Sequence, residues 1–196
     1  MALVKLEKDG YGQLELNQVA FRRSGRIEAQ CALESYVVKN EKGEVTDSGY
    51  FYDHVAENGM LLAVDNVKRV VRPVTANNIF PIALHYSTEH MYDERAKGLK
   101  NFCLKAGEFL PRMGYLGAGD KYTTNTVCFD STLSYETIKT NLAGDTVYYA
   151  VASTTKDFEG YHEIVSSLAE GVKPVALVIA ATTMPDGQKA FKFQAL

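Results

Sequence analysis

Histidine beside acidic residues is the first pattern in this chain with the chemistry to bind a metal or move a proton. His162 and Glu163 begin as a zinc-protease helix does, but the run HEIVS lacks the second histidine that the metal requires. We therefore interpret them as an ordinary surface pair. Residues 85–94 hold the densest set of possible ligands, HYSTEHMYDE. Zinc takes three or four ligands that converge, usually from separate segments. We interpret this stretch as a charged, solvated helix face, and the sequence predicts no metal site.

Nucleophiles and phosphate-binding loops give no stronger pattern. The glycines of residues 114–121, GYLGAGDK, end in Asp-Lys, whereas a phosphate loop ends in Gly-Lys-Ser/Thr. Turns between strands explain them. No serine stands in a GxSxG elbow, and the three cysteines have no CxxC spacing. Cys31 and Cys128 fall in strand-like runs, where a thiol acts as a small buried hydrophobe. The sequence therefore predicts no catalytic residue and no cofactor, and a protein that is not an enzyme.

One locally basic cluster, FRRSGR, spans residues 21–26. Two interpretations are open: the cluster grips an acidic partner surface, or it forms a solvated hairpin tip. For the first, we predict partner binding by Phe21, Arg22, Arg23 and Arg26, with Arg22 and Arg23 carrying the contact.

Composition limits the class of protein. With 196 residues, 46% of them hydrophobic, the chain can bury a core without disulfides or metal. A net charge of −3 argues against direct nucleic-acid binding, which needs surplus lysine and arginine. No apolar run approaches the ~18 residues of a membrane span. The N-terminal run MALVKLEKDG has no signal-peptide core. We expect no membrane contact, no export by a signal peptide, and a reducing compartment.

Strand patterns dominate the elements that must position any site. Residues 27–33 alternate apolar with polar, which predicts a half-buried strand. Residues 121–130 and 146–151 are rich in β-branched and aromatic residues. Residues 60–74 predict two short strands with a turn at Asp65 and Asn66. Near the C-terminus, residues 175–183 and 188–195 flank the sequence Met-Pro-Asp-Gly. Proline presets a turn and glycine tolerates positive φ, so these segments predict a C-terminal hairpin.

Helices are expected to be few. Residues 134–143 predict one, with Ser134 as its N-cap and Gly144 as its stop. Residues 87–97 are a second candidate, and residues 161–170 fit helix or strand. Residues 40–48 and 153–160 are polar and predict loops or hairpin tips.

Together these patterns predict a mainly β protein with one domain over residues 1–196. We expect a barrel or sandwich with one to three short helices and the C-terminal hairpin, and an extended N-terminal arm over residues 1–20.

Several runs together resemble small structural proteins of tailed bacteriophages. The likeness extends from about residue 12 to residue 196 and lies in these runs: GQLELNQVAF, GRIEAQC, ENGMLLAVD, PIALHYSTEHMYDERAKGLKNF, GDKYTTN and TTMPDGQKAFKFQ. The family it resembles is that of head decoration, or cement, proteins on the capsid lattice. The resemblance implies a non-enzymatic protein that binds the major capsid protein, or another virion protein, in repeated or self-associating copies. It also implies location in the virion, assembled in the host cytoplasm.

Three alternatives come from other classes. The first is a tail-tube or head–tail connector component. The second is a β-domain that binds carbohydrate or a host surface, and the third is an enzyme with a dispersed site.

Overall fold

The computed structural model describes residues 2–50, 56–87, 103–104 and 110–196. Among these residues strands far outnumber helices, which confirms the predicted mainly β fold with short helices. The described helices are α1 (Phe21–Ser24) and α3 (Tyr135–Ala143). The described strands are β1 (Leu3–Lys5), β2 (Leu14–Gln18), β3 (Ile27–Glu28), β4 (Ala32–Leu33), β5 (Ser35–Lys39), β6 (Val45–Tyr50), β7 (Leu61–Asp65), β8 (Val70–Arg72), β9 (Ile82–His85), β10 (Met113–Gly114), β11 (Lys121–Thr124), β12 (Val127–Asp130), β13 (Tyr148–Ala152), β14 (His162–Val165), β15 (Ala176–Thr183) and β16 (Lys189–Ala195).

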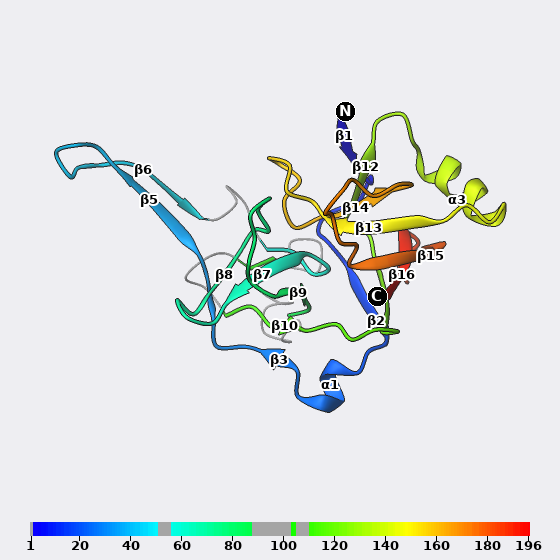
Figure 1. The fold of residues 1–196 in the computed structure, drawn as a ribbon, viewed down its shortest axis with the longest axis horizontal. Coiled ribbons are helices and arrows are strands. Elements are labelled where there is room, and N and C mark those ends of the chain that lie inside the picture. The colour runs from blue at the N-terminus through cyan, green and yellow to red at the C-terminus, as the bar shows by residue number, and fades with distance from the viewer. Residues whose placement is uncertain (1, 51–55, 88–102, 105–109) are drawn as a thin grey trace.

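These strands form two large sheets and one separate hairpin. The eight-stranded sheet has the order β1-β12-β14-β13-β15-β16-β11-β2, and the six-stranded sheet has the order β3-β10-β9-β7-β8-β4. Strands β5 and β6 pair only with each other among the described strands, and their hairpin projects from the body of the molecule (Figure 1). The sheets are open, so within the described residues the sandwich-like alternative holds and the closed barrel does not.

The eight-stranded sheet is strongly coiled. Strands β11 and β12 are five places apart in the sheet order, yet only Asn125 and Thr126 separate them along the chain. Five spacings of a flat sheet would measure roughly 24 Å. The three Cα steps from the end of β11 to the start of β12 span at most about 11 Å. The sheet must therefore curve until β11 and β12, its second strands from either edge, approach each other at this pair of residues.

The six-stranded sheet is buried on both faces at β7, all of whose residues are enclosed. Leu61 and Leu84 point into a core shared with the eight-stranded sheet. Leu62 and Ala83 point into a second core, which also holds Cys128 of the other sheet. Two apolar layers thus join the sheets.

The N-terminal segment is extended, but it is not a free arm. Strand β1 pairs with β12 and strand β2 pairs with β11, so residues 2–18 supply both outer strands of the eight-stranded sheet. Backbone pairing of β1 with β12 and of β2 with β11 holds this segment at both of its ends. One segment can reach both partners because β11 and β12 follow each other directly along the chain.

Several local predictions are confirmed. The Ser134 hydroxyl accepts a hydrogen bond from the Thr137 N–H at the start of α3, and the Gly144 N–H donates to carbonyls of its last turn. Strands β7 and β8 are joined by a turn in which the Asp65 carboxylate accepts the N–H groups of Val67 and Lys68. The predicted loop at residues 153–160 is also present.

Two predicted strands are each divided in the structure, and the segment that fitted either helix or strand, residues 161–170, contains a strand. The single strand expected at residues 27–33 is wrong: β3 and β4 lie at opposite edges of the six-stranded sheet. The Glu28 carboxylate accepts the Gln30 N–H at 2.6 Å, a local bond that competes with strand pairing. Residues 121–130 are divided at Asn125 and Thr126. Residues 161–170 form β14 followed by a loop, whereas most of the helix candidate at 87–97 lies outside the described residues. Residues 40–48 form the tip of the β5–β6 hairpin and the start of β6.

The C-terminal hairpin is confirmed. Strands β15 and β16 pair antiparallel, and the Met184 N–H donates to the Gln188 carbonyl at 2.8 Å across the turn. Gly187 has a φ of +88°, in the left-handed region that side chains disfavour.

Replacing Gly187 with valine is expected to lower the free energy of unfolding by about 1 kcal/mol or more, because valine is strained at positive φ. Urea unfolding midpoints measure the loss. Gly144→Ala is the control, since Gly144 has a φ of −97° and an added Cβ there meets no atom closer than 3.6 Å. An unchanged midpoint for Gly187→Val would contradict this turn geometry.

Candidate partner-binding site

His162, predicted to lie at the surface, is fully buried on β14, so that prediction is wrong. The side chain lies on the inner face of the strand, where its Nε2 is 2.9 Å from the Tyr122 hydroxyl. The ring also lies 4.7 Å from the ring of Phe193. Burial lowers the pKa of His162 to about 3, so the imidazole is neutral. These contacts make it a core residue.

His85 is also fully buried, which contradicts the predicted solvated helix face at this residue. It ends β9, with Nδ1 2.7 Å from the Glu57 carbonyl and Nε2 2.8 Å from the Ser87 hydroxyl. Burial lowers the pKa of His85 to about 4. A hydroxyl–imidazole–carbonyl series is also the geometry of an activated serine. Here the serine is itself buried, and its oxygen accepts the Arg112 N–H, so the series ties strands together. Among the described residues, no group of three metal-ligating side chains gathers.

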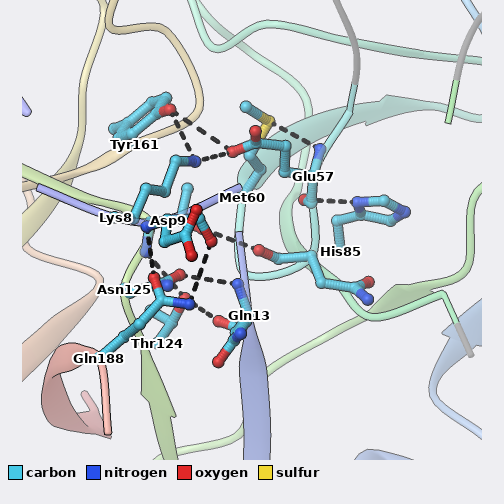
Figure 2. Close-up of polar contacts among 12 residues, drawn as sticks. Lys8, Asp9, Gln13, Glu57, Met60, His85, Thr124, Asn125, Tyr161 and Gln188 are labelled. Carbon is cyan, nitrogen blue, oxygen red and sulfur yellow. Dashed lines mark hydrogen bonds and ion pairs between the residues drawn. The ribbon is translucent and has the colours of Figure 1, made fainter. Parts of the chain in front are cut away.

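A polar cluster joins the two sheets beside His85 (Figure 2). The Lys8 ammonium forms an ion pair with Glu57 and lies 3.2 Å from the Tyr161 hydroxyl. It also lies over the Tyr161 ring, 5.2 Å from its centroid. Burial lowers the pKa of Lys8, with Glu57 acting in the opposite direction, and burial raises the pKa of Tyr161. No sequence pattern indicates this cluster, because its members are distant along the chain. Its position makes it a clamp between sheets.

The basic cluster is not a hairpin tip but the single helical turn α1, which Gly25 ends with a φ of +70°. Phe21 is fully buried, with its ring 4.9 Å from that of Tyr86, so it anchors the turn and is removed from the predicted contact residues. Arg22, Arg23 and Arg26 are exposed. Neither Arg22 nor Arg23 forms an ion pair with any residue that the structure describes.

A buried carboxylate fixes the position of this turn. Asp120 accepts the Ala20 N–H at 2.8 Å through Oδ1 and the Gly117 N–H at 2.9 Å through Oδ2. Ala20 is the residue immediately before α1, so the carboxylate joins the start of the helix to the loop before β11. These hydrogen bonds therefore fix the backbone position of the turn that carries Arg22 and Arg23.

A groove of about 930 Å³ lies between this turn and the end of β2. Strand β2 is the outermost strand of its sheet, so its outer backbone groups have no strand partner within the described part of the chain. The groove is lined by Leu16, Gln18, Val19, Arg22, Arg23 and Gly119, among others. We call this surface the arginine groove. An unpaired strand edge beside two cations can bind an extended, acidic protein segment by adding it to the sheet.

Replacing Gly114 with alanine is expected to displace Phe21 and unseat α1. An added Cβ would lie 2.5 Å from the Phe21 ring, which is fully enclosed. Overpacking of this kind costs about 1–3 kcal/mol, so the thermal midpoint should fall. Gly117→Ala, three residues further along the chain, is the control, since its Cβ would meet nothing closer than 3.7 Å. Equal midpoints for the two variants would contradict the packing described.

No protein-family model, curated protein or solved structure matches this chain. Within the described residues, no helix has the length and apolar character needed to cross a membrane.

Proposed function

We propose that this protein is a non-enzymatic structural protein that binds and stabilises a repeating protein lattice, the capsid of a tailed bacteriophage. The observation that carries the proposal is the arginine groove, in which the edge strand β2, with no strand on its outer side among the described residues, lies beside Arg22 and Arg23. The resemblance of most of the sequence to phage decoration proteins supports the choice of lattice. The partner is the major capsid protein or another virion protein, and the location is the virion.

Lattice binding needs only modest contacts from each copy. A standard interface buries about 1,600 Å² in total, and symmetry repeats it at every equivalent position. A strand added at β2 would satisfy backbone groups on the outer edge of the sheet, and carboxylates on the partner would pair with the arginines. Each copy would link neighbouring subunits and so resist expansion of the shell.

The test is to mix the purified protein with mature capsids that lack it. Cryo-electron microscopy should then show density at symmetric positions, and the melting temperature of the capsid should rise. The double variant Arg22→Glu/Arg23→Glu should weaken binding at least about tenfold, equivalent to ~1.4 kcal/mol. Lys156→Glu, a reversal at an exposed lysine outside the groove, is the control.

Absence of density on the shell, with no change in its melting temperature, would overturn the decoration role. A tail-tube or connector component then becomes the better proposal, and assembly of the protein into long tubes without capsids would support it.

A further inference from the structure

We propose that the arginine groove of one copy binds the β5–β6 hairpin of a second copy. The inference deepens the proposed role of the groove as a partner site and rests on that role, but it does not require a capsid. The partner is a second copy of this chain, and the contact is a strand of its hairpin added to β2, with the acidic hairpin tip at the arginines.

The β5–β6 hairpin has the form of an arm. Its two strands pair antiparallel with each other, from Ser35 opposite Tyr50 to Lys39 opposite Val45, and with no other strand that the structure describes. Neither of its outer edges has a strand partner within the described part of the chain. An isolated two-stranded hairpin is marginally stable in water, so pairing with a further strand would stabilise it.

The tip of the arm is acidic and ordered by its own hydrogen bonds. The Asn40 side-chain oxygen accepts the N–H groups of Lys42 and Glu44, each at 3.0 Å, and its amide donates to the Glu44 carboxylate at 2.8 Å. Residues 40–44 are all exposed. They carry two glutamates, Glu41 and Glu44, and one lysine, so the tip has a net charge of −1.

The arginine groove offers the complement of each of these features. It is lined by residues of β2, whose outer edge has no strand partner among the described residues and can accept an arm strand, and by Arg22 and Arg23. Guanidinium groups pair with carboxylates through two parallel hydrogen bonds, which favours glutamates at the end of an added strand.

The two halves of this contact cannot meet within one molecule. Figure 1 shows the arm projecting from the six-stranded sheet in the direction away from α1. Each copy therefore contributes one arm to a neighbour and binds the arm of another copy in its groove. Such head-to-tail contacts close into rings or continue as open filaments, depending on the rotation between copies.

Charge exchange between two variants tests the contact. The groove variant is Arg22→Glu/Arg23→Glu, and the arm variant is Glu41→Lys/Glu44→Gln, which keeps an acceptor for the Asn40 amide. Sedimentation velocity at low salt should show concentration-dependent association of the unmodified protein, weaker when salt rises to about 0.5 M. Each variant alone should associate at least about tenfold more weakly. An equal mixture should recover association, because each altered surface then meets an opposite charge.

Two exposed residues outside the groove and the arm, Lys156→Glu and Glu170→Lys, serve as charge controls and should associate like the unmodified protein. Circular dichroism and thermal midpoints confirm that each variant is folded. A monomeric unmodified protein at all concentrations, or variants whose mixture does not recover, would overturn the arm–groove contact.

The capsid experiment separates this failure from failure of the proposed function. A monomer that still binds capsids overturns only the arm–groove contact, and a monomer that does not bind them overturns both. Recovery by mixing supports the contact, whether electron microscopy shows small rings or long tubes; long tubes would move the function to the tail.

Discussion

Lowering the pH from 7 to 4 is expected to destabilise this protein steeply. His85 and His162 are buried as neutral rings, and burial lowers their pKa values to about 4 and about 3. In the unfolded chain both titrate near the ordinary histidine pKa of about 6.5. Between about pH 6.5 and 4 the unfolded state therefore binds more protons than the folded state, and stability falls as the pH falls. Above about pH 6.5 neither state is protonated and the effect vanishes.

The expected slope is about 1.4 kcal/mol per pH unit for each histidine, or ~2.7 kcal/mol for both. Urea midpoints at pH 7, 6, 5 and 4 measure it. The carboxyls of Asp65, Asp130 and Asp186, whose pKa values are lowered, lose their contributions only below about pH 4, so the two effects separate.

The variant His162→Gln is the control for the assignment. It is less stable at pH 7, because the histidine packs against Tyr122 and Phe193, but the slope between pH 6.5 and 4 should fall to about half. A stability that is flat from pH 7 to 4, or a slope that the variant leaves unchanged, would show that these rings do not control acid sensitivity.

Replacing Glu57 with glutamine is expected to lower the free energy of unfolding by roughly 3 kcal/mol or more. The side chains of Lys8 and Glu57 are only 12% and 13% exposed, so the change leaves a buried ammonium without its charge partner. Removing both charges, in Lys8→Met/Glu57→Leu, should recover most of the loss, because neither variant group then needs solvation. Urea unfolding of the unmodified protein, Lys8→Met, Glu57→Leu and the double variant gives the coupling between the two residues.

The loss should also depend on pH in a way that altered packing would not. Without Glu57, the pKa of Lys8 falls further below that of the unfolded chain. Stability should then rise as the pH increases toward about 10, because the unfolded state binds the extra proton. The control is Glu136→Gln, which breaks the ion pair between Glu136 and Lys189. Their side chains are 64% and 50% exposed, so little change is expected. Equal losses for Glu57→Gln and Glu136→Gln would contradict a buried clamp.

Sequence patterns succeeded where the physical cause is local. Proline, aspartate and glycine at residues 185–187 define a turn by their own backbone preferences, and the C-terminal hairpin follows. Ser134 caps α3 because its hydroxyl reaches an N–H three residues on. Alternating apolar residues predicted many strands, but not the break at residues 29–31, where the Glu28 carboxylate competes with strand pairing.

The candidate site shows the same division. The sequence identified Arg22 and Arg23 as a cluster, since their charges are adjacent. It did not place them beside a free strand edge, because that edge exists only when β2 pairs with β11 about a hundred residues later. It also misassigned Phe21, whose burial depends on Gly114 of β10 and on Tyr86, which follows β9.

By itself the sequence determined the mainly β character, the turns, the caps and the basic cluster, because each arises from neighbours within a few residues. The tertiary structure decided which strands became edges, which histidines became neutral core residues, and that Lys8 would meet Glu57 and Tyr161. These outcomes depend on desolvation and on contacts between distant segments. Residue spacing carries no information about either until the chain has folded.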